Sequence, residues 1–380
     1  PRYYYKSLYV IMRPIMKKKV LYLFSDTGGG HRSAVNAIIK AVEQLKPGRF
    51  NQEMVDAFAQ CSGFLNVFAR LYAPVIKYSP ELWGMLYYWL DDQKKLAQLE
   101  KISRPFILKE LTKLIVVRRP ELIVSVHPMV NHLTVQAIRA SGLKIPFVVV
   151  ITDPVTLHRA WIKPETDLVI VGTKEARRNA ITYGMPENKV KVIGMPIDPK
   201  FLLAQKNKRT KEDKFTILLM GGGEGAGKMG EIIKEFDRAR FNGRLIAICG
   251  RNKSLEEELK KKSARFSFEL EVIGFTDQVP EVMGRSDLII TKAGPGTIAE
   301  ALAKNLPIII TSWLPGQEEG NVDYVVKEKV GKVSKDPKKV VDLVNRIRTN
   351  GEYEAMKKNI KRVSKPDAAL GIAKEIFKYL

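Results

Sequence analysis

A histidine that follows a run of glycines is the first feature of this chain that can do chemistry. Residues 20–24 have the apolar pattern of a buried strand, Gly28 to Gly30 follow, and His31 opens a stretch with helical periodicity. Glycines let backbone approach a ligand closely, and a helix N-terminus attracts negative charge. A histidine at this corner can act as a proton acceptor, because its pKa lies near neutrality. The alternative, that the glycines only make a tight turn between strand and helix, stays open.

Length and composition limit the class of protein. The chain has 380 residues, of which 45% are hydrophobic, and its apolar runs are far shorter than the roughly 20 residues that a membrane span needs. We therefore expect two globular domains. The net charge of +23 indicates an acidic partner such as a nucleic acid, an anionic lipid or a nucleotide phosphate. The alternative is a generally lysine-rich surface, as in some thermophiles.

Neither the cysteines nor the spacing of other residues indicates a disulfide framework or a metal site. The two cysteines, Cys61 and Cys249, lie far apart, and Cys249 ends an apolar run. This usage predicts reduced thiols in a cytoplasmic setting. No cluster has the spacing of metal ligands, so we expect neither a metal nor a cofactor.

Short apolar runs alternate with helical stretches along the whole chain, which predicts an α/β fold with two doubly wound, Rossmann-like domains. The expected strands of the first domain are residues 20–24, 122–126, 147–151, 168–171 and 190–193. Those of the second are residues 216–220, 245–249, 270–273, 288–290 and 308–311. A polar linker is expected near residues 197–214. The predicted units are a basic, aromatic leader (1–15), an N-terminal domain (16–200), a C-terminal domain (201–365) and a final helix (366–380) that packs back on the N-terminal domain.

Ligands of open α/β sheets bind beyond the carboxyl ends of the strands, and two glycine-rich loops of the second domain lie there. Gly221 to Gly227 precede Lys228 and can present backbone N–H groups to a phosphate, although Met229 excludes a Walker loop. After residues 288–292 come Gly294, Gly296 and Thr297, and Thr297 is expected to cap a helix whose N–H groups face a diphosphate.

Two acidic side chains of the second domain have the chemistry to bind sugar hydroxyls. Glu300 can hold a ribose, or it can be the capping-box partner of Thr297, which stands three positions earlier. Gln317 and Glu318 supply an amide and a carboxylate on a third loop that also contains Asn321. The alternative for this loop is simple solvation.

Six segments together resemble the GT-B glycosyltransferases of the monogalactosyldiacylglycerol synthase and processive diacylglycerol glucosyltransferase family. This family is related to the peptidoglycan enzyme that transfers N-acetylglucosamine. The segments are Ser25 to His31, Ser125 to Pro128, Val150 to Asp153 with His158 and Trp161, Gly194 to Ile197, Gly294 to Glu300, and Pro315 to Asn321. The resemblance covers nearly all of the chain from Met16 to about Ile376.

The resemblance implies an inverting, metal-independent transfer of a galactose or glucose from a UDP-sugar to the sn-3 hydroxyl of diacylglycerol, giving a β-glycosyldiacylglycerol. His31 would be the base, with Asp26 or Asp153 orienting its ring. The donor-binding residues implied are Gly222, Gly223, Phe275, Gly294, Gly296, Thr297, Glu300, Gln317, Glu318 and Asn321. Those implied for the acceptor side are Gly29, Gly30, His127 and Trp161.

The aromatic segment between residues 64 and 90 is a candidate membrane contact. It contains Phe64, Phe68, Tyr72, Trp83 and Trp89, with Arg70 and Lys77 nearby. Aromatic residues beside cations suit an interface with anionic headgroups, so we expect a monotopic protein on the cytoplasmic face of a membrane. An ordinary buried helix stripe has the same periodicity and remains the alternative.

Three other functions remain to be weighed. N-acetylglucosamine transfer to a lipid-linked muramyl peptide is disfavoured by the contexts of His127-Pro128 and Gln317-Glu318-Glu319. A basic nucleic-acid-binding protein would carry clustered arginines with stacking aromatics along a groove, whereas the aromatics here concentrate in one segment. A UDP-binding scaffold without activity is the third. The oligomeric state is open.

Overall fold

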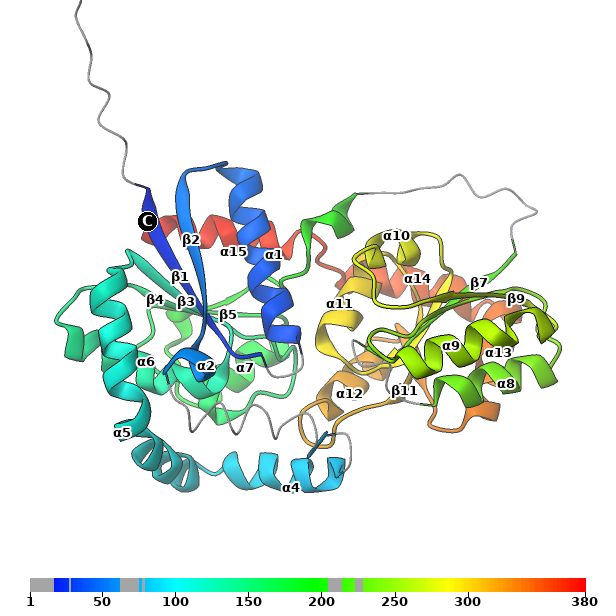
Figure 1. The fold of residues 1–380 in the computed structure, drawn as a ribbon, viewed down its shortest axis with the longest axis horizontal. Coiled ribbons are helices and arrows are strands. Elements are labelled where there is room, and N and C mark those ends of the chain that lie inside the picture. The colour runs from blue at the N-terminus through cyan, green and yellow to red at the C-terminus, as the bar shows by residue number, and fades with distance from the viewer. Residues whose placement is uncertain (1–16, 27–28, 62–74, 77–78, 204–213, 223–227) are drawn as a thin grey trace, which may run out of the picture.

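The computed structural model contains two parallel six-stranded sheets, each covered by helices on both faces, which confirms the predicted α/β class. The structure describes residues 17–26, 29–61, 75–76, 79–203, 214–222 and 228–380. The two domains lie side by side, and the chain crosses between them near residue 200 and again before the last helix (Figure 1). The predicted leader, residues 1–15, lies outside the described residues.

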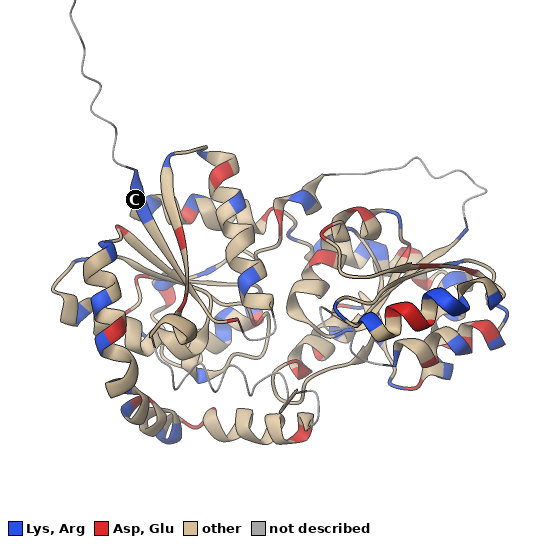
Figure 2. Cartoon of the chain, in the orientation of Figure 1, with Lys and Arg blue, Asp and Glu red and all other residues tan. Residues whose placement is uncertain are grey.

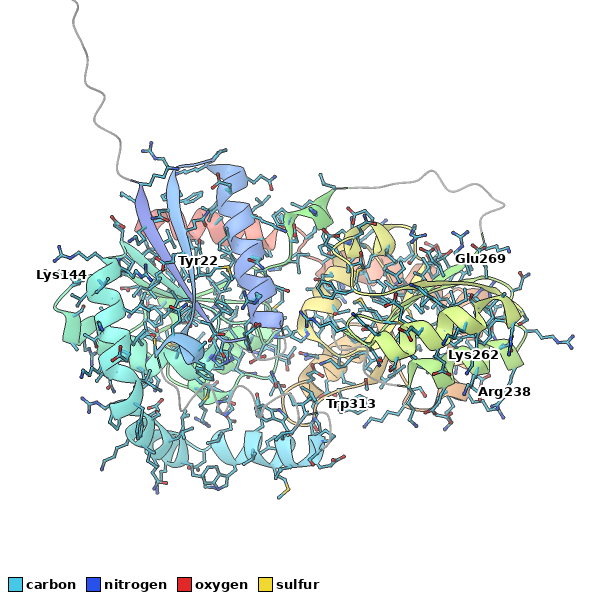
Figure 3. The ribbon with its side chains drawn as sticks, in the orientation of Figure 1. Tyr22, Lys144, Arg238, Lys262, Glu269 and Trp313 are labelled. Carbon is cyan, nitrogen blue, oxygen red and sulfur yellow. The ribbon has the colours of Figure 1, made fainter. Side chains whose placement is uncertain are left out.

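The first domain has the strand order β2-β1-β3-β4-β5-β6. Its strands are β1 (Lys18–Phe24), β2 (Phe50–Asp56), β3 (Leu122–Ser125), β4 (Phe147–Val150), β5 (Leu168–Val171) and β6 (Val190–Val192). Its helices are α1 (Gly30–Leu45), α2 (Ala57–Cys61), α4 (Pro80–Leu90), α5 (Gln93–Arg118), α6 (Asn131–Ser141) and α7 (Lys174–Thr182). Successive residues of β1 pack into separate apolar clusters on the two faces of the sheet, as alternation along a strand requires. Tyr22, inside this core, is labelled in Figure 3.

The second domain repeats the architecture with the strand order β12-β11-β10-β7-β8-β9. Its strands are β7 (Thr216–Met220), β8 (Arg244–Ile248), β9 (Glu269–Ile273), β10 (Leu288–Lys292), β11 (Ile308–Ser312) and β12 (Gly331–Val333). Its helices are α8 (Met229–Arg238), α9 (Lys253–Lys262), α10 (Val279–Gly284), α11 (Pro295–Ala303), α12 (Glu319–Lys327), α13 (Pro337–Thr349) and α14 (Glu352–Val363). The central strands are apolar throughout because helices cover both of their faces.

Two strands that the sequence did not predict, β2 and β12, lie at sheet edges. Strand β2 includes Asn51, Gln52 and Glu53, and β12 has only three residues. An edge strand has a neighbour on one side only and is less buried, so its sequence lacks the continuous apolar run that marks a central strand.

Helix α15 (Ala368–Ile376) belongs to the first domain in space, although it follows the second in sequence. It packs against α1, and Ala369, Ile372, Ala373 and Ile376 join the apolar cluster that contains Val20 and Tyr22. Chain order and spatial order therefore differ at this end. Among the helices of the described part, none has both the length and the apolar character needed to cross a membrane.

We predict that Ile372→Ala lowers the free energy of unfolding by about 2–4 kcal/mol, because it leaves a cavity in a closed core. Ile372 has no exposed surface. Urea denaturation followed by circular dichroism measures this loss. The matched control is Ile102→Ala on the exposed face of α5, where 62% of the residue is accessible. Equal destabilisation by both variants would contradict the packing of α15 on this domain.

Candidate active site

His31 lies at the start of α1, beside the end of β4. Gly29 is the N-cap of this helix and has a left-handed φ of 81°, which favours glycine. The His31 ring contacts the His127 ring edge-on at a centroid distance of 4.6 Å and lies 6.4 Å from the Trp161 ring. The Thr152 hydroxyl is 3.2 Å from His31 Nδ1. The histidine is thus half-buried and held by side chains that follow β3 and β4, not simply displayed on the surface.

Burial keeps His31 neutral. Loss of solvent lowers the pKa of His31 to about 4, and a hydrogen bond to the Val126 backbone carbonyl offsets part of this shift. The sequence attributed a neutral imidazole to the positive end of the helix, whereas burial is the largest cause. Burial, together with the neighbouring His31, also lowers the pKa of His127. Above about pH 4 the imidazole of His31 is therefore neutral, the state in which a ring nitrogen can accept a proton.

Asp153 does not orient His31 as predicted. Asp153 is buried, and its Oδ2 accepts a hydrogen bond of 2.6 Å from Trp161 Nε1. Asp26, the other candidate, pairs instead with Arg32, at 2.9 Å between Oδ2 and Nη2. The residue that meets the His31 ring is Thr152, which follows β4 and which sequence reasoning missed. A polar residue at the carboxyl end of a central strand was the signal for it.

The carboxyl group of Asp153 has a strongly shifted pKa. Burial raises it to about 7; the Trp161 hydrogen bond lowers it in part, and the Glu318 carboxylate raises it further. Glu318 belongs to the loop after β11 in the second domain, so its effect on Asp153 shows that the two domains meet near this aspartate. Asp153 is consequently close to half protonated near neutral pH.

Two residues that were expected on the acceptor side are buried. Trp161 has no exposed surface, and His127 is 5% exposed. The prediction that Trp161 contacts the acceptor directly is therefore wrong, because its indole ring is fully enclosed. Trp161 supports Asp153, and His127 lies between His31 and Phe58, whose ring centroid is 5.1 Å away. Gly29 and Gly30 lie at the start of α1, with open space where a Cβ would stand.

The second glycine loop opens α11, but not with the cap that the sequence predicted. Gly294 is the N-cap, Pro295 is the first helical residue, and no side chain caps the helix. Thr297 therefore lies within the first turn. The backbone N–H groups of Gly296 and Thr297 belong to the donors that a helix N-terminus leaves without an intrahelical partner. Gly296 has open space around it, and Gly222 lies close to the Lys292 side chain, as Gly294 does.

Because Thr297 is not the N-cap, the capping-box interpretation of Glu300 is wrong. Glu300 lies one turn further along α11 and is half-buried. Burial raises the pKa of Glu300 to about 8, with a smaller contribution from the Asp198 carboxylate. At neutral pH this carboxyl group is largely protonated, so it can both donate and accept hydrogen bonds, and hydroxyl groups, which also do both, are suitable partners for it.

Glu318 anchors a loop, which contradicts a direct role in binding hexose. It is 3% exposed; its Oε1 pairs with Lys292 Nζ, and its Oε2 accepts a hydrogen bond of 2.8 Å from the Leu314 backbone N–H. Both oxygens are occupied. The sequence analysis did not identify Lys292. Its Cε lies 3.9 Å from the point where a Cβ would stand on Gly222 and equally far from that point on Gly294. The Lys292 ammonium group thus lies between the two glycine loops. Its position at the end of β10 was the sequence feature that could have predicted it.

The remaining predicted donor residues lie around these loops. Asn321 is buried, and its Nδ2 donates to the Ala293 carbonyl at 2.9 Å, so it joins the third loop to the second. Gln317 is half-buried in the third loop. Trp313, labelled in Figure 3, lies near the start of this loop, on the side of the second domain that faces the first. Phe275, after β9, is exposed, with the Arg251 guanidinium 5.0 Å from its ring centroid.

Several predicted residues cannot be placed. Gly223, Phe64, Phe68 and Tyr72 lie outside the described residues. Of the two tryptophans in the aromatic segment, Trp89 is exposed on α4 and Trp83 is half-buried. The described part of the chain contains no group of three or more histidine, cysteine or acidic side chains arranged to hold a metal ion.

Asp153 gives a prediction about stability. A carboxyl group whose pKa rises on folding binds its proton more tightly in the folded chain, so between about pH 4 and pH 7 it makes stability fall as pH rises. Asp153→Asn keeps an acceptor for Trp161 and removes this dependence. We expect the difference between the melting temperature of the variant and that of the unmodified chain to be more positive at about pH 8 than at about pH 5. A constant difference across that range would show that Asp153 does not titrate there.

Comparison with known proteins identifies both halves of the chain. A family model described as monogalactosyldiacylglycerol (MGDG) synthase matches residues 31–197, and the glycosyltransferase family 28 C-terminal domain matches residues 216–371. Among solved structures, MurG of Acinetobacter baumannii is similar with a TM-score of 0.64 at 16% identity, covering 95% of this chain and 99% of that one. The glycotransferase of kitacinnamycin gives a TM-score of 0.64 at 13% identity, over 96% and 99% of the two chains. These likenesses confirm the predicted GT-B architecture.

Curated relatives extend the match over nearly the whole sequence. The probable chloroplastic monogalactosyldiacylglycerol synthase of Glycine max is 35% identical, over 94% of this chain and 71% of its own. Monogalactosyldiacylglycerol synthase 2 of Arabidopsis thaliana is 33% identical, over 94% and 80% respectively. The two domains, the loops that meet between them and this identity along the chain lead to one conclusion: the chain belongs to the monogalactosyldiacylglycerol synthase family.

Proposed function

We propose that this protein is a glycosyltransferase that transfers galactose from UDP-galactose to diacylglycerol, forming galactosyldiacylglycerol. The observation that carries the proposal is identity of about one third with relatives named monogalactosyldiacylglycerol synthases, over 94% of the chain. A half-buried, neutral histidine beside the junction of the two domains agrees with it. The relatives' names favour galactose over glucose, a choice that the sequence left open.

His31 is the proposed base. The diacylglycerol hydroxyl oxygen attacks the anomeric carbon of the sugar as its proton passes to a ring nitrogen of His31. The bond between that carbon and the diphosphate oxygen breaks, and UDP leaves with the electron pair. Attack opposite the leaving group inverts the anomeric configuration. Thr152, 3.2 Å from Nδ1, is in position to fix the ring.

The second domain is the proposed donor site. Glu300 takes the ribose, and Gly222 with the free N–H groups at the start of α11 takes the diphosphate. Lys292 adds a positive charge between these loops. Helix N-terminus and lysine together can stabilise the charge that develops on departing UDP, so we propose that the transfer needs no metal.

We also propose that α4 and the start of α5 rest on a lipid surface, which makes the protein a peripheral membrane protein. Leu82, Met85, Leu86 and Trp89 of α4 are exposed, and so are Ile102 and Phe106 of α5. Figure 2 shows α4 almost free of charged residues, and Lys94 and Lys95 follow it. Apolar and aromatic side chains next to lysines suit anionic headgroups. The cytoplasmic face remains a prediction, and no nucleic acid partner is proposed.

The direct test supplies purified protein with vesicles of anionic phospholipid and diacylglycerol and with UDP-galactose, UDP-glucose or UDP-N-acetylglucosamine. We expect galactolipid from UDP-galactose, in equal amounts with and without chelator. N-acetylglucosamine transfer to a muramyl lipid in place of this product would establish the alternative function. Absence of any glycolipid would overturn the enzyme assignment, and loss of activity with chelator would overturn the metal-free transfer.

For the base, we predict that His31→Ala lowers kcat by about two to four orders of magnitude, the contribution of a positioned proton acceptor. Affinity for UDP, measured by calorimetry, should stay unchanged because the proposed donor residues lie on the second domain. His132→Ala, on α6, where the imidazole pairs with Glu100 of α5 at 3.2 Å, is the matched control. Turnover near that of the unmodified protein would remove His31 as the base.

A further inference from the structure

Helix α4 contacts the donor-sugar loop, defined here as residues 313–321, with the face opposite its exposed one. A Cβ built on Gly84 would lie 2.7 Å from Pro315 Cβ, and one built on Gly316 would lie 2.8 Å from Tyr87 Cδ1. Gly316 also has a left-handed φ of 75°, so a side chain there is excluded twice. Tyr88, which is 57% exposed, donates from its hydroxyl to Glu319 Oε2 across the domain junction. Figure 1 shows α4 running beneath the first domain toward α12.

The same helix is tied to the loop that carries Asp153. The Tyr87 ring contacts the His158 ring edge-on at 5.0 Å, and Asp91, at the end of α4, accepts a hydrogen bond of 2.7 Å from the Arg159 backbone N–H. His158 and Arg159 lead directly to Trp161, whose indole holds Asp153. One short helix thus joins the loop beside the base to the loop beside the donor.

The two loops also touch each other next to α4. Gly320 packs against Thr156, and Lys327 of α12 pairs with Glu175 of α7 at 3.0 Å. Beside this contact lies a cavity of about 280 Å³ lined by Tyr88, Gly316 and Glu319 among others. The packing around the donor-sugar loop is therefore incomplete on one side, and its position depends on the contacts that α4 supplies.

From these contacts we infer that α4 couples lipid docking to donor binding: Tyr87 and Tyr88 are positioning residues that set the donor-sugar loop when the outer face of α4 lies on an anionic lipid surface. The inference rests on the proposed function. A helix of eleven residues transmits restraint from one face to the other because its backbone is rigid. Lipid bound to Met85 and Trp89 limits the motion of Tyr87 and Tyr88, and these limit the loop.

Coupling between two sites is reciprocal, which gives a test without turnover. Calorimetry would measure UDP-galactose and UDP affinities with and without vesicles of anionic phospholipid that lack diacylglycerol. We expect vesicles to tighten UDP-galactose binding by about fivefold, within the usual range of such couplings. UDP binding should stay unchanged, because Gln317 is the residue of this loop that the resemblance assigns to the hexose. Saturating UDP-galactose should tighten vesicle binding by the same factor.

Tyr88→Phe removes the donor and Glu319→Ala removes the acceptor of one hydrogen bond, so each variant should abolish the vesicle effect. Their double variant should show no further loss, as for residues that act as a pair. Tyr353→Phe, which removes a hydrogen bond of 3.4 Å to Asp287 elsewhere in the second domain, should keep the effect in full. All variants should retain UDP binding, which reports that the second domain is folded.

Equal UDP-galactose affinity with and without vesicles in the unmodified protein would overturn the inference, and so would a vesicle effect that persists in Tyr88→Phe. Failure of the proposed function gives a different result. In that case UDP-galactose does not bind under any condition, or it binds and no galactolipid forms when diacylglycerol is added.

Discussion

The chemistry of this protein depends on burial where the loops after β4 and β11 meet. Removal from water lowers the pKa of His31 to about 4 and raises that of Asp153 to about 7. The histidine is therefore neutral, and the aspartate is close to half protonated near neutrality. Neither state follows from a local motif. Each exists because side chains from separate strands close around the group and exclude solvent.

The same closure changes the roles of conspicuous residues. Glu318 has its oxygens engaged by Lys292 and the Leu314 backbone, and Asn321 holds the Ala293 carbonyl. Glu318 was expected to bind the hexose, and Asn321 was expected to bind the donor. Buried polar groups must find partners inside the protein, so these residues fix the loops on which the site is built. Lys292, which pairs with Glu318, lies between the glycine loops, where we propose that the diphosphate binds.

Helix α4 extends this organisation to the surface. Its outer face is apolar and exposed, and the helix meets the donor-sugar loop through the buried Tyr87 ring and through the hydroxyl of Tyr88, which is itself exposed. A lipid substrate and a water-soluble donor must meet at one carbon atom. If the outer face of α4 lies on a lipid surface, as we propose, this helix gives the protein a direct physical link between the two encounters.

The sequence by itself determined the α/β class, the central strands and the loops at their carboxyl ends, because continuous apolar runs and glycines report local backbone needs. The same motifs were sufficient to predict the family, and they indicate His31 as the base that we propose. Only the tertiary structure decided the edge strands β2 and β12, the N-cap at Gly294, the partner of His31 and the roles of Glu318 and Trp161. These depend on which side chains become enclosed together, and residues as far apart in the chain as His31 and Thr152, or Tyr88 and Glu319, meet only when the sheets are assembled.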